Sequence, residues 1–253
     1  MSVDAGETPS VAIVTPIYNE ASTIARYIHV VTGLDPAPTE IVVVDGASED
    51  DAPARARAAG LTVVEADRRG RAPQINQGVA GVSADYICVL HADTEIPHDA
   101  VKTIRTTLGD PRVGLAAFTP LIAGPDAVRW ASSFHNWAKC WYAPFFFRPR
   151  FFFKGGRLLF GDQAMFFRRR DFLAVGGFDP DILVMEEADL CLKMIARGRQ
   201  RVVNRLAVTS DRRFAEKGEL RQNLLLFEIG LKWAFGFKKG LERRYPPVRR
   251  ADQ

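Results

Sequence analysis

The stretch that decides the fold is Tyr86-Ile87-Cys88-Val89-Leu90-His91-Ala92-Asp93. Its first five residues form a continuous apolar run, which is typical of a strand buried on both faces of a sheet. The run ends abruptly in an imidazole and a carboxylate. Because ligands bind at the carboxyl ends of the strands in open α/β sheets, this end predicts a site. Asp93 either binds a hard cation such as Mg²⁺ together with ligand phosphates or caps the turn before a helix near Pro97.

The first 65 residues alternate between strand and helix patterns. Apolar runs at 11–14, 40–45 and 61–65 predict buried strands, and the segments between them predict helices that end at Gly33 and Gly60. This alternation implies right-handed crossovers and a mostly parallel sheet with helices on both faces, which is an α/β fold. We expect Pro16 to end the first strand, because proline has no N–H to donate to a sheet.

Further helices and strands follow downstream. The predicted helices are 74–82, 97–108, 170–175, 185–194 and 219–237, and the predicted strands are 113–118, 201–203 and 207–210. Before the first of these helices, a loop carries Arg68, Arg69 and Arg71. Three arginines beside a helix N-terminus predict an anion site, although a solvated run of charge explains them more simply when the loop is taken alone.

Two segments of the C-terminal half suit either a membrane surface or a packed interior. Residues 127–160 are dense in aromatic side chains flanked by cations, as in Phe145-Phe146-Phe147-Arg148-Pro149-Arg150-Phe151-Phe152-Phe153. This pattern suits a lipid-facing surface or an apolar ligand, and it suits a core or a dimer contact equally. Pro144 and Pro149 argue against one long helix there. The amphipathic helix at 219–237 either docks on the domain, which we favour, or lies on a membrane.

The composition is that of an ordinary globular chain. The 253 residues suit one large domain or two small ones, with 47% hydrophobic and 25% charged residues. The formal charge of +4 fits anionic substrates or an anionic membrane surface, but the basic residues are dispersed among 30 acids, which argues against a nucleic-acid binder.

The three cysteines, Cys88, Cys140 and Cys191, are not spaced as metal ligands are, and they favour a reducing compartment. No secretory signal and no membrane-spanning apolar run is predicted.

Three carboxylates crowd the first turn of the helix predicted at 185–194. Glu186 and Asp189 are three residues apart and share a face, whereas Glu187 points elsewhere and is free to line a cleft. Favourable placement of acids at a helix N-terminus explains one or two of them easily and three less well. Like charges packed together raise a pKa, which suits a general base.

Four motifs stand in an order that resembles one enzyme family. They are Val14-Thr15-Pro16-Ile17-Tyr18-Asn19-Glu20, Val43-Val44-Asp45-Gly46-Ala47-Ser48-Glu49-Asp50, Leu90-His91-Ala92-Asp93-Thr94 and Glu186-Glu187-Ala188-Asp189-Leu190. Together they resemble the family 2 glycosyltransferases, the inverting enzymes of GT-A fold, and within them a bacterial subgroup with His-Ala-Asp-Thr in place of Asp-x-Asp. The resemblance implies a single Rossmann-like GT-A domain over 1–253, with a core at 11–215 and a C-terminal helical tail at 216–253.

The resemblance also implies roles for individual residues. Glu187 matches the catalytic base, and Asp93 matches the last acid of the Asp-x-Asp motif, which binds Mg²⁺ or Mn²⁺. The residues implied in nucleotide-sugar binding are Pro16, Tyr18, Glu20, Asp45, Arg71, Gln74, His91 and Arg213, with Asp45 accepting a hydrogen bond from the base. Those implied near the donor sugar and the acceptor are Gly161, Asp162, Gln163 and Glu186.

Two positions depart from the family's pattern. His91 stands at the first acid of Asp-x-Asp. A neutral imidazole binds transition metals, so His91 and Asp93 together would be ligands of Mn²⁺ rather than Mg²⁺. Otherwise His91 contacts the ribose or nothing. Glu187 stands where the base is usually Asp, and its extra methylene shifts the acceptor hydroxyl outward by about one bond length.

The resemblance therefore implies metal-dependent, inverting transfer of a sugar from a nucleotide-sugar, expected to be a UDP-sugar, to an acceptor hydroxyl. The aromatic segment suggests a lipid or another apolar acceptor. Two alternatives are less favoured. A sugar-phosphate nucleotidyltransferase would want a Gly-rich loop and a Lys after the first strand, where Thr15-Pro16-Ile17-Tyr18-Asn19-Glu20 stands instead. A degenerate GT-A module would bind nucleotide-sugar or a membrane surface without catalysis, and the presence of Asp45, Asp93 and Glu187 together argues against it. We expect a cytoplasmic protein, peripheral at the inner face of the cell membrane if the membrane interpretation holds, with no nucleic-acid partner.

Overall fold

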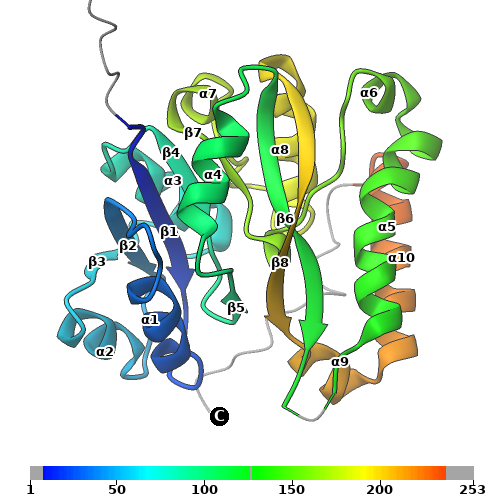
Figure 1. Cartoon of the computed structure of the whole chain (residues 1–253). Coiled ribbons are helices and arrows are strands. Elements are labelled where there is room, and N and C mark those ends of the chain that lie inside the picture. The colour runs from blue at the N-terminus through cyan, green and yellow to red at the C-terminus, as the bar shows by residue number, and fades with distance from the viewer. Residues whose placement is uncertain (1–7, 126, 238–253) are drawn as a thin grey trace, which may run out of the picture.

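The computed structural model describes residues 8–125 and 127–237, apart from the side chains at positions 213 and 217. Within these residues, eight strands form one sheet in the order β3-β2-β1-β4-β7-β6-β8-β5. Helices cover both faces of the sheet (Figure 1), and a hydrophobic core lies on each face. The α/β fold expected from the sequence is confirmed.

The N-terminal half of the sheet is parallel. Its strands are β1 (Val11–Ile17), β2 (Glu40–Asp45), β3 (Thr62–Glu65) and β4 (Tyr86–Val89), and its helices are α1 (Ile24–Thr32), α2 (Ala52–Ala58) and α3 (Arg71–Gly81). β1 pairs with β2 and β4, and β2 pairs with β3. Val11 and Ile13 enter one core and Ala12 and Val14 the other, because successive side chains of a strand point to opposite faces.

Pro16 does not end β1, contrary to expectation. It lies opposite Val44 of β2 in the parallel register. Val14 O accepts a hydrogen bond from Leu90 N, so the polar groups of Val14 point to the side of β4. Two residues further on, Pro16 faces the same side, but β4 pairs with β1 only as far as Val14. The missing N–H of Pro16 therefore leaves no sheet hydrogen bond unmade.

The C-terminal half makes the sheet mixed. Its strands are β5 (Thr94–Glu95), β6 (Val113–Ala123), β7 (Phe166–Arg168) and β8 (Arg199–Ser210). β7 runs antiparallel between β4 and β6, β6 pairs parallel with β8, and β5 pairs antiparallel with β8. The parallel arrangement expected from the sequence is thus found among β1 to β4. The strands β5 to β8 form both parallel and antiparallel pairs. β8 is one strand where two were predicted, because it accompanies β6 through an irregularity after Phe118.

The remaining helices complete the two layers. They are α4 (Ala100–Leu108), α5 (Trp130–Phe147), α6 (Pro149–Phe153), α7 (Arg169–Ala174), α8 (Glu186–Met194), α9 (Arg212–Lys217) and α10 (Glu219–Ala234), with the 3₁₀ turns η1 (Gly161–Gln163) and η2 (Ile195–Arg197). None of the helices in the described residues is long and apolar enough to cross a bilayer.

The aromatic segment is not one long helix, as expected, but of the two prolines only Pro149 separates helices, because α5 continues past Pro144. The 18 residues of α5 include Pro144, three residues before its end. Proline removes the hydrogen bond to the carbonyl four residues earlier, which here is that of Cys140. Leu158 N donates to Cys140 O at 3.3 Å instead, so the freed carbonyl has a partner from another segment. Pro149, at the first turn of α6, separates the two helices, a position that proline favours.

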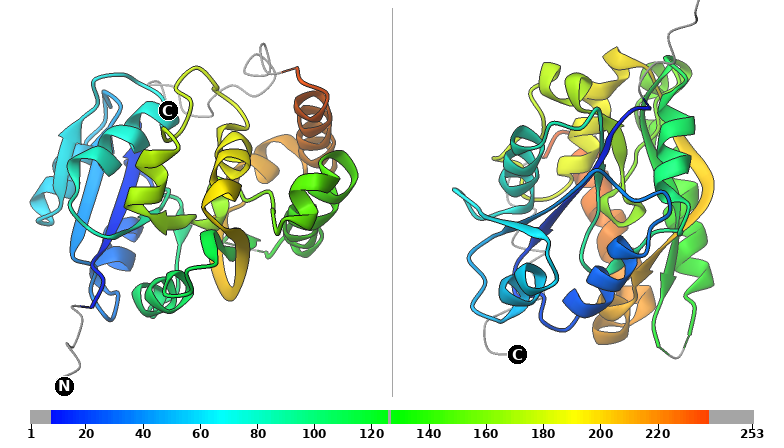
Figure 2. Two further views of the ribbon diagram at one scale, coloured as in Figure 1. Left: turned by 90° about the horizontal axis from the view of Figure 1, so that it is seen from above. Right: turned by 60° about the vertical axis from the view of Figure 1, so that its left-hand side comes forward.

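Helix α10 packs beside α5 at the end of the molecule opposite β3 (Figure 2). Its Ile229 and Trp233 are buried in one core. At the start of the helix pair, the Ser132 hydroxyl donates to Glu219 Oε1 at 2.6 Å, and at its other end the rings of Phe147 and Phe235 are 6.2 Å apart. The two helices therefore run in the same direction. The docked arrangement favoured from the sequence is what the structure has, and residues 238–253 of the predicted tail lie outside the described residues.

Candidate active site

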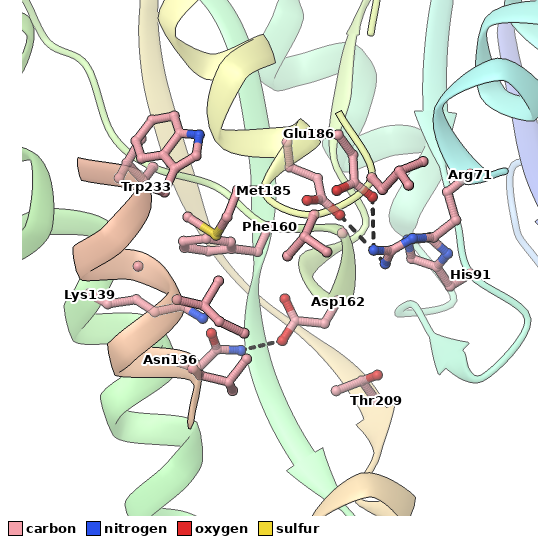
Figure 3. Close-up of a pocket in the computed structure, with 18 of the residues that line it drawn as sticks. Arg71, His91, Asn136, Lys139, Phe160, Asp162, Met185, Glu186, Thr209 and Trp233 are labelled. Carbon is pink, nitrogen blue, oxygen red and sulfur yellow. Dashed lines mark hydrogen bonds and ion pairs between the residues drawn. The ribbon is translucent and has the colours of Figure 1, made fainter. Parts of the chain in front are cut away.

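A cavity of about 600 Å³ lies where the carboxyl ends of β1 and β4 face α5 and α10. Its walls come from segments far apart in the sequence. We call the part lined by Pro16, Tyr18, Glu20, Arg69 and Arg71 the N-terminal arm, and the part between α5 and α10 the helical arm. Between the two arms lies a centre formed by His91, Asp93, Gly161, Asp162, Glu186 and Glu187 (Figure 3).

The N-terminal arm is built on the loop after β1. Asn19 has a left-handed backbone, with φ of 51°, which asparagine tolerates better than most residues. Its Oδ1 accepts a hydrogen bond from Glu49 N at 2.9 Å, and its N–H donates to Ser48 Oγ at 2.9 Å, which ties the loop to the segment after β2. Beside it, the Arg69 guanidinium carbon lies 3.6 Å from the centroid of the Tyr18 ring. An aromatic face and a cation therefore line this arm together.

Asp45 and Gln74, both implied in nucleotide binding, are engaged by the protein itself. Asp45 is buried behind the wall of the cavity and accepts hydrogen bonds from the hydroxyl of Ser48 at 2.5 Å and from its N–H at 3.2 Å. Gln74 lines the cavity, but its Nε2 donates to Ile17 O at 2.8 Å and to Val44 O at 2.7 Å. Gln74 thus joins the ends of β1 and β2. The side chains of Asp45 and Gln74 both support the shape of the N-terminal arm.

Arg71 bridges the two halves of the site. It is the first residue of α3, and its guanidinium reaches the first turn of α8 (Figure 3). Its Nη2 lies 2.8 Å from Glu186 Oε1, and its Nη1 lies 3.8 Å from Glu187 Oε1. Both glutamates therefore face the same cation, whereas the sequence predicted that they point apart. Asp189 pairs with Lys193 at 3.0 Å.

The residue before α8 is strained. Met185 has φ of 69°, a left-handed conformation that is unfavourable for a residue with a side chain of this size. Strain of this kind costs about 1–3 kcal/mol and collects at functional sites. Here it sets the direction in which α8 starts, and it thereby aims Glu186 and Glu187 at the centre of the cavity.

Burial raises the pKa values of two carboxyl groups at the centre and lowers that of the His91 imidazole. It raises the pKa of Glu186 from 4.5 to about 8, against the opposing effect of Arg71 and with the charge of Glu187 adding to the rise. Burial also raises the pKa of Asp162 above its usual value. It lowers the pKa of His91, and Arg71 lowers it further. The centre therefore favours a neutral imidazole at His91, and the carboxyl groups of Glu186 and Asp162 ionise less readily than in water.

Gly161 is the point where the backbone comes closest to the functional side chains. A Cβ at this position would lie 2.5 Å from His91 Nε2 and 2.7 Å from Glu187 Oε1, closer than such atoms approach one another in proteins. The backbone of η1 is therefore in contact with both. Gln163, two residues further on, faces the core instead, where its Nε2 donates to Cys140 Sγ at 3.2 Å.

His91 and Asp93, the residues proposed for a metal ion, both line the cavity on the turn after β4, and the charge of Asp93 acts on His91. In the part of the chain that the structure describes, no group of three or more His, Cys, Asp and Glu side chains is arranged to hold a metal. One carboxylate and one neutral imidazole are a partial donor set. They fit an ion such as Mn²⁺ whose remaining ligands come from a substrate diphosphate and water.

The helical arm has one polar and one apolar wall. On α5, Asn136 Nδ2 donates to Asp162 Oδ2, and Lys139 Nζ lies 3.8 Å from the centroid of the Phe160 ring (Figure 3). On α10, the lining residues are mostly apolar: Leu226, Phe227, Ile229, Leu231 and Trp233. The arm thus presents hydrogen-bonding groups and a cation opposite a continuous apolar surface.

The contribution of α10 to the cavity was not expected from the sequence, in which residues 216–253 were placed outside the core as a tail. Gln222 and Trp233 are only 1% and 2% exposed, and both line the helical arm. Both amide atoms of Gln222, and Nε1 of Trp233, have no hydrogen-bond partner among the described residues. Helical spacing showed that one face of α10 is apolar, but no feature of the sequence indicated that α5 would lie opposite.

Most of the residues proposed from the sequence line one cavity. They are Pro16, Tyr18, Glu20, Arg71, Gln74, His91, Asp93, Gly161, Asp162, Glu186 and Glu187. Asp45 and Gln163 lie behind its walls. The side chain of Arg213 lies outside the described residues, and its neighbour Arg212 lines the cavity.

Comparison with known sequences gives one family. The profile of "Glycosyl transferase family 2" matches residues 12–176. The poly-β-1,6-N-acetyl-D-glucosamine synthase of Staphylococcus aureus is 27% identical over 132 residues, which are 50% of this chain and 32% of that protein. A Mycobacterium tuberculosis protein described as uncharacterized is 26% identical over 201 residues, 75% of this chain and 63% of that one. The chain thus spans less than two thirds of the length of these relatives.

Solved structures share the fold. A mannosyltransferase from Pyrobaculum calidifontis in complex with GDP-Man and Mn²⁺ has a TM-score of 0.67 at 21% identity, covering 92% of this chain and 65% of that one. Glucosyl-3-phosphoglycerate synthase of Mycobacterium tuberculosis, in complex with Mn²⁺, UDP and glucosyl-3-phosphoglycerate, has a TM-score of 0.60 at 18% identity, covering 92% and 82%. S. aureus TarS with UDP-GlcNAc has a TM-score of 0.59 at 13% identity, covering 79% and 58%.

Proposed function

The chain belongs to glycosyl transferase family 2, and from this premise we propose that it is a metal-dependent, inverting glycosyltransferase. It transfers a sugar from a nucleotide-sugar to a hydroxyl group of an acceptor. The observation that carries the proposal is the meeting of Glu187, Asp93 and Arg71 in one cavity, on three segments that the sequence keeps far apart.

The N-terminal arm suits the nucleotide diphosphate of the donor. The Tyr18 ring offers an apolar face for a base, and Arg69 and Arg71 are cations near the diphosphate. Asp45 supports this arm from behind through Ser48. We take UDP-sugars as the first candidates. Because the structurally similar proteins include complexes with UDP, UDP-GlcNAc and GDP-Man, the donor test needs both nucleotides.

Transfer with inversion is a single displacement at the anomeric carbon. The acceptor oxygen forms a bond to this carbon as the bond from the carbon to the diphosphate oxygen breaks, and Glu187 accepts the proton of the acceptor hydroxyl. The nucleoside diphosphate leaves with the bonding electron pair, and Arg71 stabilises its growing charge. Gly161 keeps the space between His91 and Glu187 free of a side chain.

The proposed metal ion is held by Asp93 and His91. When bound, a divalent ion supplies Lewis-acid stabilisation of the leaving diphosphate. His91 can serve as a ligand because the pKa shift keeps its ring neutral near pH 7. The imidazole favours Mn²⁺ over Mg²⁺, since Mg²⁺ prefers oxygen ligands throughout.

The helical arm is the proposed acceptor site. It adjoins the centre beside Asp162, and its α10 wall is apolar over Leu226, Phe227 and Leu231. These features support a lipid or another acceptor with a substantial apolar part. An acceptor could reach the unpaired polar atoms of Gln222 and Trp233 only if this arm opens, because these atoms are buried.

The first test is a thermal-unfolding series with UDP, GDP, CDP and their sugars, each with Mn²⁺, Mg²⁺ or a chelator. A ligand at one hundred times its dissociation constant stabilises the folded state by about 2.7 kcal/mol, a shift that is easily measured. The proposal expects a shift with one nucleotide class that depends on the metal ion. Stabilisation by no nucleotide, in the presence of either metal, contradicts it. Metal-dependent binding without sugar transfer to any lipid extract instead supports a binding module.

A further inference from the structure

A segment of unusual composition covers α5 and α6, and most of its exposed side chains lie outside the cavity. Residues 127–161 contain no Asp or Glu, and their cations are Arg129, Lys139, Arg148, Arg150, Lys154 and Arg157. The same segment holds twelve of the chain's 26 aromatic residues. A stretch of the chain with this composition is positively charged and aromatic, and it is unlike the mixed composition of the remaining sequence.

Many of these aromatic side chains are exposed to solvent. Trp130 and Phe146 are 71% and 69% exposed, and Phe153 is 75% exposed. Trp130, Phe134 and Trp137 are spaced so that they lie on one side of α5, and all three are exposed. Large exposed aromatic side chains are unusual on a soluble surface when they gather in this way, and they mark a binding surface.

Exposed cations accompany the aromatic side chains. Arg148, Arg150 and Lys154 flank or lie within α6, and all three are exposed. The neighbouring helix α10 adds exposed Leu224, and Phe235 directly after it is exposed too, with its ring 6.2 Å from that of Phe147. After Phe237 the sequence continues with six further Lys and Arg residues and two acids.

We infer that α5 and α6, together with the exposed residues of α10, form a docking surface for an anionic lipid bilayer. Aromatic rings suit the interface between lipid headgroups and acyl chains, and cations beside them are attracted to anionic headgroups. A second copy of the chain is a worse occupant, because symmetric pairing places the acid-free segment against itself and brings like charges together. The inference does not require the proposed function, although a bilayer is where an apolar acceptor would be presented to the helical arm.

Vesicle co-sedimentation of the full chain, without nucleotide or metal ion, tests the surface. We expect binding to vesicles of phosphatidylcholine mixed with phosphatidylglycerol, weaker binding to phosphatidylcholine alone, and loss of the difference as the salt concentration rises. The double variant Arg150→Glu and Lys154→Glu is expected to weaken binding to the anionic vesicles at least about tenfold. The double variant Phe146→Ser and Phe153→Ser is expected to weaken binding to both kinds of vesicle. None of these four residues lines the cavity.

Matched controls come from exposed leucines elsewhere in the fold. The double variant Leu173→Ser and Leu206→Ser removes apolar side chains that are 44% and 50% exposed on α7 and β8, and it is expected to bind vesicles like the wild type. Because all of these positions are exposed, thermal unfolding should show that every variant folds. Asp93→Ala, which tests the proposed metal site, is expected to keep vesicle binding, so that the two proposals can fail separately.

Three outcomes overturn the inference. The first is that the wild-type chain binds neither kind of vesicle. The second is that the Arg150→Glu and Lys154→Glu variant and the Phe146→Ser and Phe153→Ser variant both bind as well as the wild type, which assigns any binding to another surface. The third is a dimer in gel filtration that the Phe146→Ser and Phe153→Ser variant abolishes, together with absent vesicle binding, which makes the surface a contact between copies of the chain.

Discussion

Arg71 and Glu186 form an ion pair across the cavity, with Nη2 and Oε1 2.8 Å apart, and the same guanidinium lies 3.8 Å from Glu187 Oε1. The glutamates belong to α8 and the arginine to α3, so one side chain holds the two halves of the site together. A donor diphosphate would compete with the carboxylates for this guanidinium. Its binding and the release of Glu187 for proton transfer would then occur together.

Replacing Arg71 tests this link. Arg71→Met removes the cation and leaves two buried carboxyl groups, so we expect the free energy of unfolding to fall by about 1–3 kcal/mol near pH 7. The loss should be larger above about pH 8, where Glu186 is ionised and depends most on the cation, than at pH 7. Denaturant unfolding measures both, and nucleotide titration should show weaker donor binding. Arg68→Met is the matched control, because its partner Asp181 is exposed. If Arg68→Met lowered the free energy of unfolding as much as Arg71→Met does, the loss would not depend on the buried glutamates.

The raised pKa of Glu186 predicts an unusual pH dependence of stability. The folded state holds this proton more tightly than the unfolded state does, so between pH 4.5 and about 8 the free energy of unfolding falls as the pH rises. Glu186→Gln removes the titration and should flatten the curve in this window, with a difference on the order of a few kcal/mol across it. Denaturant unfolding at several pH values measures the slope. Identical slopes in variant and wild type would contradict the shift.

Glu187→Gln tests the catalytic base. The variant is nearly isosteric, so donor binding in the thermal-unfolding series should persist, while sugar transfer falls by about 10²–10⁴-fold because no carboxylate accepts the acceptor proton. Transfer is measured with the donor that the series identifies. Glu65→Gln, at an exposed position on β3, is the control and should keep full activity. Normal turnover by Glu187→Gln would assign the base to another residue.

Asp93→Ala tests the metal site. If Asp93 and His91 hold the ion together, the variant should lose the part of the nucleotide-induced stabilisation that depends on Mn²⁺ and keep the part seen with chelator. The chain itself should remain folded, because Asp93 is only partly buried. The same metal-dependent stabilisation in variant and wild type would show that the ion does not need this carboxylate.

Gly161→Ala tests the crowding at the centre. The added methyl group meets His91 Nε2 and Glu187 Oε1, and one of them has to move. We expect a cost of about 1–3 kcal/mol in stability and a larger loss of transfer, since small displacements of a base reduce catalysis strongly. Gly81→Ala is the control, because a Cβ there has no atom within 4 Å; it should raise the unfolding free energy by up to about 1 kcal/mol. Unaltered turnover by Gly161→Ala would mean that the centre is looser than its geometry implies.

The sequence predicts the N-terminal half of the fold well, because its signals are local. Each of β1, β2 and β4 is a continuous apolar run, and the polar residues that line the cavity follow β1 and β4 directly. His91 and Asp93 could be proposed on that basis alone. Tyr18 and Asp45 were implied by the family resemblance; Tyr18 lines the cavity, whereas Asp45 accepts hydrogen bonds from Ser48, and its role with the nucleotide base stays a prediction.

The C-terminal half is less predictable because its structure depends on distant partners. Pro144 signals a break in a helix, and only the donation from Leu158 N to the Cys140 carbonyl explains why α5 continues past it. Likewise, β8 is continuous because β6 lies alongside, which periodicity within β8 does not reveal. The helical arm requires both α5 and α10, so no single stretch of sequence could indicate it.

The docking of α10 against α5 also determines when the site is completed during synthesis. The ribosome delivers the N-terminal arm early, with residues up to Asp93, whereas Trp233 of the helical arm is synthesised much later. A domain generally folds as a unit, so the cavity cannot be complete before α10 has left the ribosome. A chain that ends before α10 would lack the apolar wall of the helical arm.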